Sequence, residues 1–462
     1  MMGKINQKMI NNNTFSIIEH QAFSKEDLQG IFKEKAKKFY QELEDFAKNN
    51  ENFLGFKNKN TLTAKNYVGI IQTKSGVLEI LPKCTNLDSY KDKECKLSTI
   101  SKEKLLKNYI LNQISQAKTS ENFYGEDFAF NPKTLLINML KTLKNSPFKK
   151  SQIKKSQISS LQISKMPLLE VFIAMFLDEL DGVYKKGLKK DYISIEENRN
   201  FLKGKLQFSQ HLKQNLVHKE RFFTQSDEFM LDIAPNRLIK STLNLLKSKT
   251  THHKFKIIKA LEMFDEVGFS TNYEKDFTYK ISRHFDYYEN LLSWCKIFLQ
   301  NQTFAPYKGK NEAFALLFPM EKLFEDYVAH MLKKANPTQN IKTQSSGKYL
   351  ISKKGEKCFM LKPDLYIENE TILDTKWKIP DSNEDKKHGI AQSDLYQMFA
   401  YACKFKIHDI KLIYPLCERT MSLQNTIKEL EFNANEHLAF LNDNSPLKTN
   451  IKVQVIFAPL PF

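Results

Sequence analysis

Residues 362–378 read KPDLYIENETILDTKWK, and their pattern indicates the fold of the C-terminal part of the chain. Two runs rich in apolar and aromatic residues, 359–367 and 371–377, flank the polar residues 368–370. A polar segment of this length typically joins two antiparallel strands. The stretch therefore predicts a tight β-hairpin.

The hairpin would gather three functional side chains on one face. Alternate side chains of a strand share a face, so Asp374 and Lys376 should point the same way, and Asp364 on the other arm can face that side too. Paired carboxylates hold Mg²⁺, or Mn²⁺, with waters left in its coordination shell. The lysine can orient or deprotonate a water and stabilise charge in a transition state. The alternative is a surface hairpin with ordinary solvated ion pairs.

These residues resemble the PD-(D/E)-x-K nuclease superfamily, in which Pro363-Asp364 and Asp374-x-Lys376 match the signature. The resemblance implies an α/β core with a helix before the hairpin and a second helix after it. Residues 320–332 have the periodicity of an amphipathic helix, with Leu323, Tyr327, Val328 and Met331 on one stripe. Residues 393–404 predict the second helix, with Ser393 as N-cap.

Three residues of these flanking helices are further site candidates. Gln397 and Tyr401 lie four positions apart and share a helix face. Their Q-x-x-x-Y pattern is similar to an accessory motif of the RecB-like branch, which implies that they line the site and orient DNA or the hairpin. Glu325 is a candidate third metal ligand, directly or through water. Its alternative role is an ion pair with a nearby lysine.

Bulk properties limit the class of protein. The chain has 462 residues, of which 41% are hydrophobic, enough for two or three domain cores. No apolar run has the length of a transmembrane helix and no signal peptide is recognisable, so a cytoplasmic protein is expected. No G-x-x-x-x-G-K-[ST] motif occurs, so nucleotide hydrolysis is not expected of this chain. The six cysteines lack C-x-x-C spacing and suggest neither a zinc site nor a disulfide framework.

The formal charge is +18, which favours a polyanionic partner such as nucleic acid. Lysine greatly outnumbers arginine, so background composition also contributes to this charge. Two arginines follow an asparagine, Arg199 and Arg237. A structural role that fixes one element against another is preferred for both over direct DNA contact.

The expected architecture is α+β and multidomain. A β-rich N-terminal domain spans residues 1–100, a mainly helical middle domain spans 101–304, and the α/β nuclease core spans 305–462. In the first domain we expect a helix over 25–49 with Leu28, Phe32, Ala36 and Phe39 on its apolar stripe. A hairpin over 67–83 should turn at Gly76, where glycine can adopt positive φ.

The middle domain should contain several helices. Candidates are residues 102–116, 132–143 and 167–181, and another helix begins after Pro235. The repeated KKSQI at 149–158 is interpreted as a basic loop, and residues 86–100 as a charged connection.

Four stretches resemble the McrC family, the nuclease subunits of McrBC restriction systems specific for 5-methylcytosine. They are YVGII…LEILPK at 67–83, ENRNFLKGKL with NRLIK, LFPMEKLFEDYV at 317–328, and PD…DTKWK with QSDLYQMFAYA. The resemblance implies an endonuclease acting on double-stranded DNA with an McrB-like AAA+ GTPase ring. It also implies that the N-terminal region docks on that ring and stimulates GTP hydrolysis.

Two other functions compete with this interpretation. One is a RecB-like nuclease of a DNA-repair or other phage-defence complex with a different motor. The other is a non-enzymatic adaptor with a dead site, against which the intact Asp364, Asp374 and Lys376 argue.

Overall fold

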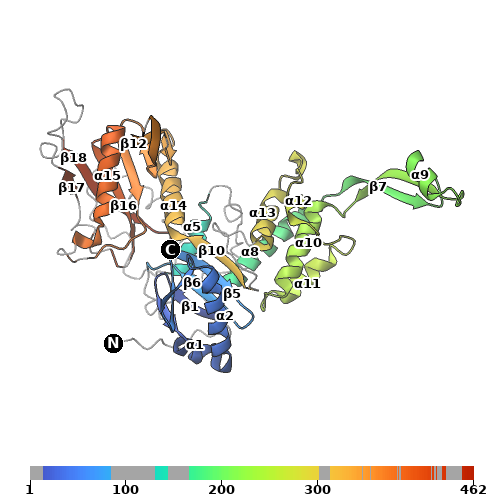
Figure 1. The fold of residues 1–462 in the computed structure, drawn as a ribbon, viewed down its shortest axis with the longest axis horizontal. Coiled ribbons are helices and arrows are strands. Elements are labelled where there is room, and N and C mark those ends of the chain that lie inside the picture. Colours follow the sequence, from blue (N-terminus) through green and yellow to red (C-terminus); the bar gives the residue numbers. More distant parts are fainter. Residues whose placement is uncertain are drawn as a thin grey trace. The chain divides into compact units, whose positions relative to one another are not determined.

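The protein has a mixed α and β fold with several sheets (Figure 1). The computed structural model describes residues 14–84, 131–143, 166–300, 313–345, 347–353, 355–381, 383, 387–417, 419–420, 423, 429–432 and 450–461. Its contacts divide the chain into two compact units. Of the described residues, 14–84, 131–143, 166–168 and those from 313 onward form the first unit, and 169–300 form the second.

Two sheets and two helices make up the N-terminal part of the first unit. The elements are β1 (Thr14–Ile18), β2 (Ala22–Ser24), α1 (Lys25–Phe32), the 3-10 turn η1 (Lys33–Lys35), α2 (Ala36–Asn49), β3 (Leu54–Asn58), β4 (Thr61–Ala64), β5 (Tyr67–Gln72) and β6 (Val77–Leu81). The first sheet has the order β1-β6-β5-β10, where β10 is Phe314–Pro319, and the second has the order β2-β4-β3. The strand β10 pairs antiparallel with β5, so residues assigned by sequence to the third domain complete a sheet of the first.

The close approach of β10 to β5 explains why residue 69 of that sheet is a glycine. Gly69 has φ +134°, and a Cβ there would lie 1.9 Å from the carbonyl oxygen of Leu316. Gly76, by contrast, does not have the positive φ that the sequence predicted. Its Cβ would lie 2.4 Å from the ring of Phe32, so space and not backbone conformation requires glycine there.

The predicted helix over 25–49 is interrupted. Lys33 has φ +50° and ends α1, and α2 begins at Ala36. All four residues of the predicted stripe are nevertheless buried, in one cluster with residues of β1 and β10: Leu28, Phe32, Ala36 and Phe39. The apolar face is therefore confirmed although the helix is not continuous.

A six-stranded sheet forms the C-terminal part of the first unit. Its strands are β11 (Ile341–Thr343), β14 (Leu365–Ile367), β15 (Thr371–Thr375), β16 (Asp409–Leu416), β17 (Glu429–Phe432) and β18 (Ile451–Pro459). Their order is β11-β14-β15-β16-β18-β17, and β15, β16 and β18 run parallel. Nearly every residue of β16 is buried, as expected for a central parallel strand.

The first unit also contains helical elements, two of which pack on this sheet. The elements are α5 (Pro132–Leu140), α14 (Met320–Ala335), the 3-10 turn η3 (Lys387–Gly389) and α15 (Gln392–Phe405). Helix α14 contacts β15, and α15 contacts β16 and β18. Helix α14 ends at Ala335, before Pro337, and buries Leu323, Tyr327, Val328 and Met331, which confirms the predicted apolar stripe.

The hairpin of residues 362–378 forms, but its first arm is shorter than predicted. Only β14 pairs with β15, and Asn369 in the turn has φ +59°, a conformation that asparagine tolerates. Residues before Pro363 belong to a separate hairpin of β12 (Lys348–Lys353) and β13 (Glu356–Leu361). Proline has no N–H to donate to a sheet, which fits a break in the strand at this point.

The second unit combines helices with a β-ribbon. Its elements are α8 (Leu168–Lys186, which starts at the last residue of the first unit), β7 (Asp191–Arg199), β8 (Lys205–Leu206), α9 (Phe208–Gln214), β9 (Phe222–Met230), α10 (Ala234–Lys247), α11 (Lys254–Glu262), α12 (Tyr273–Asp276), η2 (Arg283–Phe285) and α13 (Tyr288–Leu299). Helix α10 packs against α11, α12 and α13. Strands β7 and β9 pair along their whole length, and α9 lies towards the far end of this ribbon (Figure 1).

The sequence predicted a mainly helical domain here and did not predict this β-ribbon. The buried positions of its two strands are polar, namely Arg199, Thr224 and Ser226, so the sequence lacks the apolar periodicity on which a strand prediction depends. The helix predicted over 132–143 ends at Leu140, and that over 167–181 runs to Lys186. The predicted helix 102–116, the connection 86–100 and the KKSQI repeat lie outside the described residues.

Arg199 and Arg237 have the structural roles that were preferred. Arg199 is 8% exposed and donates hydrogen bonds to Glu197 Oε2 at 2.9 Å, Ser226 Oγ at 2.8 Å and Glu228 Oε1 at 2.8 Å. It thereby ties β7 to β9. Arg237 in α10 pairs with Asp232 at 2.7 Å.

Candidate functional site

The end of strand β15 is the centre of the candidate site. Asp374 is 1% exposed on β15, and Lys376 follows the strand, held by a 2.8 Å hydrogen bond from its backbone N–H to Ile413 O. Their side chains form an ion pair, with 2.6 Å between Lys376 Nζ and Asp374 Oδ2. The predicted shared face of these two residues is therefore present.

Asp364 approaches from the loop before β14. Its Oδ2 accepts hydrogen bonds from Thr375 N at 2.8 Å and from Thr375 Oγ1 at 2.6 Å. Asp364 is thus fixed by the neighbour of Asp374, and its charge acts on both Asp374 and Lys376. Thr375 is a site residue that the sequence reasoning did not select, since strand alternation placed it on the opposite face.

Burial and neighbouring carboxylates shift the pKa values of both Asp374 and Lys376. Burial raises the pKa of Asp374, and the charge of Asp364 raises it further, against the opposing effect of Lys376. Burial lowers the pKa of Lys376, but the charges of Asp374, Asp394 and Asp364 outweigh it and raise the pKa above its usual value. Lys376 is therefore an ammonium group at neutral pH.

Helix α15 supplies the residues that hold Lys376. Lys376 Nζ donates to Gln397 Oε1 at 2.9 Å, and Gln397 Nε2 donates to Tyr401 Oη at 2.8 Å. Tyr401 Oη in turn donates to Lys362 O at 3.0 Å, next to Pro363-Asp364. Gln397 and Tyr401 thus join the two arms of the signature through one chain of hydrogen bonds.

Asp394 is a site residue that the sequence reasoning did not assign to the site. It is 6% exposed, accepts from Lys378 Nζ at 2.6 Å, and lies 3.9 Å from Lys376 Nζ. Asp394, Gln397 and Tyr401 have i, i+3, i+7 spacing, and this helix-face pattern could have identified Asp394. The predicted N-cap Ser393 is wrong: α15 starts at Gln392 with Ala391 as N-cap.

Glu325 lies on α14, 8% exposed. Its Oε1 accepts from Lys322 Nζ at 2.9 Å and from Gln344 Nε2 at 3.0 Å. Burial raises the pKa of Glu325, and the negative charge of Asp364 raises it further. Glu325 therefore interacts electrostatically with a residue of the candidate site. The ion pair of the alternative interpretation is present, and the metal-ligand role stays a prediction.

The carboxylates of the candidate site suit the coordination of Mg²⁺. Among the described residues, no three His, Cys, Asp or Glu side chains form a ready-made metal cluster. Mg²⁺ usually binds through one or two carboxylates, with waters and substrate phosphate completing its octahedron. Asp364 and Asp374 supply two carboxylates whose mutual repulsion a cation would relieve, so the residues fit this ion.

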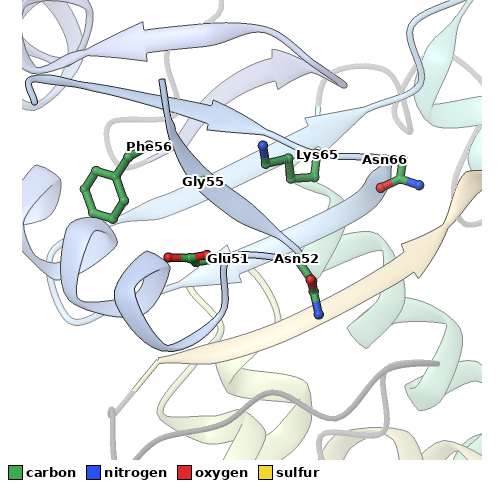
Figure 2. A pocket seen from close by; sticks show the side chains of 6 residues that line it. All are labelled: Glu51, Asn52, Gly55, Phe56, Lys65 and Asn66. Atoms are coloured by element: carbon green, nitrogen blue, oxygen red, sulfur yellow. The ribbon is translucent and has the colours of Figure 1, made fainter. Parts of the chain in front are cut away.

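A pocket of about 420 Å³ lies elsewhere (Figure 2). It is lined by Glu51, Asn52, Gly55, Phe56, Lys65 and Asn66, all from the segment around β3 and β4. None of the candidate site residues lines it. The candidate site is therefore defined by its side-chain chemistry and not by this pocket.

Comparisons with known proteins identify a family and a fold. The sequence model of the family "McrBC 5-methylcytosine restriction system component" matches residues 62–415. A chain of the refined half-complex from the tetradecameric assembly of Thermococcus gammatolerans McrB AAA+ hexamers with bound McrC has a TM-score of 0.60. It is 18% identical, and the match covers 96% of this chain and 94% of that chain.

A second solved structure, the cryo-EM structure of the Thermococcus gammatolerans McrBC complex, has a TM-score of 0.45 at 19% identity. That match covers 69% of this chain and 87% of that chain. No curated protein matches the sequence. Within the described residues, no helix is long and apolar enough to cross a membrane.

Proposed function

Because the chain belongs to the McrBC 5-methylcytosine restriction system component family, we propose that it is the DNA-cleaving subunit of such a system. In this proposal it is a Mg²⁺-dependent endonuclease that hydrolyses phosphodiester bonds of double-stranded DNA. The observation that carries the proposal is the convergence of Asp364, Asp374 and Lys376 at the end of β15. This is the arrangement implied by the PD-(D/E)-x-K resemblance.

Asp364 and Asp374 would hold the metal ion, which is Mg²⁺ or, in its place, Mn²⁺. When bound, the ion supplies Lewis-acid polarisation of the scissile phosphate and acidifies water. Burial of Asp374 keeps competing water away from its carboxylate. The Thr375 hydrogen bonds fix the orientation of Asp364, so that little rearrangement is needed on binding.

Lys376 would act through its positive charge. Its raised pKa keeps it protonated, so it suits the stabilisation of negative charge on the phosphate better than removal of a proton. Gln397 holds the ammonium group from α15, and Tyr401 positions Gln397. Glu325 would support the metal site from α14, directly or through water.

The proposed partner is an McrB-like AAA+ GTPase ring, which would provide the nucleotide-driven step that this chain lacks. The family assignment favours this partner over the motor of a repair complex. Docking through the N-terminal region stays a proposal. Arg199 and Arg237 are committed to ion pairs within the second unit, so neither is a free arginine finger.

Cleavage of 5-methylcytosine-containing DNA tests the nuclease proposal. The assay uses the full chain with its GTPase partner, GTP and Mg²⁺, and compares Asp374→Asn with Asp409→Asn. Asp409 lies beside Thr371 at the opposite end of the same strand pair, and makes a matched control. We expect Asp374→Asn to lose at least ~100-fold in rate, since several kcal/mol of transition-state stabilisation are removed. It should also lose Mn²⁺ binding measured calorimetrically without DNA; parental cleavage by this variant would refute the assignment.

A further inference from the structure

The hairpin of β12 and β13 leaves apolar side chains without cover. Leu350 and Ile351 on β12 are 40% and 51% exposed, and Phe359 and Met360 on β13 are 70% and 41% exposed. A two-stranded ribbon has only its two faces, and adjacent residues point to opposite ones. Both faces of this hairpin are therefore partly open and apolar.

The same hairpin is basic. Its described residues, 347–353 and 355–362, include one acid, Glu356, and the exposed lysines Lys348, Lys353, Lys357 and Lys362. Lys357 lies over the ring of Tyr349, with 5.8 Å between Nζ and the ring centroid. Positive charge interleaved with apolar and aromatic groups fits the phosphates, sugars and base edges of DNA.

Phe359 has an unusual backbone. Its φ is +56°, and the regular pairing is interrupted there, since Tyr349 pairs with Met360 and Ile351 with Cys358. A bulky residue at positive φ is strained, and strain of this kind is concentrated at functional sites. Phe359 has no burial that would explain it, because its side chain is largely in solvent.

The hairpin is tied to the candidate site by chain and by contact. Only Lys362 and Pro363 separate β13 from Asp364. Tyr401 of α15 donates to Lys362 O at 3.0 Å, and α15 also packs against β12 (Figure 1). The base of the hairpin is thereby held by the helix that holds Lys376.

We propose that the β12–β13 hairpin is a DNA-binding element that enters a groove next to the scissile phosphate. Its lysines contact the backbone, and Phe359 packs against the sugars or bases. A two-stranded ribbon has the width of the major groove, and apolar side chains such as phenylalanine also wedge into the minor groove. The inference rests on the proposed nuclease function, since it assigns this surface to the substrate of that site.

Binding of DNA without cleavage tests the lysines. The Asp374→Asn protein is titrated with a fluorescent 30-base-pair duplex over a series of KCl concentrations. Lys348, Lys353 and Lys357 are replaced together by Ala, and the control replaces the exposed Lys35, Lys37 and Lys38. We expect the slope of log affinity against log salt to become shallower by about 2–3 for the hairpin variant. The control should retain the parental slope.

Phe359→Gly separates a binding role from a structural one. Glycine accepts positive φ without strain, so this variant should melt at or above the parental temperature. We nevertheless expect its DNA affinity to fall by about fivefold or more, in line with loss of an aromatic contact to nucleic acid. A purely structural role for Phe359 predicts no loss of affinity.

The outcomes are distinct. Unchanged DNA affinity and salt slope in both hairpin variants would overturn the proposal. If those variants instead lost binding to the GTPase partner, the hairpin would be a protein-docking surface and the proposal would again be wrong. Since all measurements use a protein impaired in cleavage, absence of nuclease activity in the parent would refute the proposed function without altering this result.

Discussion

Trp377 Nε1 donates a 2.9 Å hydrogen bond to Glu19 Oε2, and the two residues are 358 positions apart in the sequence. Glu19 follows β1 of the N-terminal sheet, and Trp377 follows Lys376 of the candidate site. Both side chains are buried, and the indole also packs on Phe324 with 5.3 Å between ring centroids. The N-terminal sheet is therefore bonded directly to the segment that carries the candidate lysine.

Glu19 gives this contact a pH dependence. Burial raises its pKa to about 7 from the usual 4.5, although Lys83 and Trp377 oppose the shift. Between these pH values the folded protein holds a proton that the unfolded chain releases. The stabilising contribution is therefore complete below pH 4.5 and is lost as the pH rises through 7.

Glu19→Gln removes this titration. Relative to the parent, the variant should gain in free energy of unfolding as the pH rises from 4.5 to 7, by up to about 3 kcal/mol. Urea unfolding at a series of pH values measures the difference, in which groups common to both proteins cancel. Identical pH dependences for the two proteins would show that Glu19 does not titrate in this range.

Gln397 should position the lysine without touching substrate. Gln397→Ala removes the acceptor of Lys376 Nζ, and we expect the cleavage rate to fall by about 10–100-fold, as for other supporting residues of metal sites. Affinity for DNA should change little. The matched control is Gln392→Ala on the same helix, because Gln392 bonds the exposed Tyr396 and not the site. Equal losses in both variants would point to destabilisation of α15.

Local patterns predicted the parts of the site that local structure determines. The turn at 368–370, the pairing of β14 with β15 and the buried stripe of α14 each depend on residues close in sequence. The shared face of Asp374 and Lys376 follows from strand alternation alone.

Long-range packing determined what the sequence did not reveal. The pairing of β10 with β5 joins segments that neither periodicity nor turn chemistry relates. Lys33, at φ +50°, ends α1 inside a continuous apolar stripe, although residues of both helices lie in one buried cluster. Thr375 was not predicted as a site residue because strand alternation places it on the face opposite Asp374, and its contact with Asp364 depends on the path of the loop before β14.

Gly69 tests the close approach of β10 to β5. Gly69→Ala would place a Cβ 1.9 Å from Leu316 O at φ +134°, so we expect destabilisation by roughly 2 kcal/mol or more. Gly182→Ala in α8 is the control, because a Cβ there meets nothing within 4 Å. That substitution should stabilise by about 0.5–1 kcal/mol. Thermal melting that ranks the variants in the opposite order would contradict the packing described for these strands.

Because β10 pairs with β5, docking through the N-terminal region has to be tested without truncating the chain. Removal of residues 1–100 would strip β1, β5 and β6 from β10 and take away the partner of Trp377. A truncated protein would expose a buried sheet, and loss of GTPase stimulation would then follow from misfolding as well as from lost docking. Single charge reversals in the full chain avoid this ambiguity.

Lys74 is the residue whose charge we propose to reverse. It is exposed in the turn between β5 and β6, where Ser75 N and Oγ donate to Glu42 of α2 at 3.0 and 2.9 Å and fix the backbone. Lys59→Glu, in the exposed turn between β3 and β4, is the control with equal charge change. If the Lys74 turn meets the GTPase ring, Lys74→Glu should lower stimulation of GTP turnover about tenfold, because a reversed charge at an interface mainly slows association. Stimulation equal to that of Lys59→Glu would exclude this turn as the docking surface.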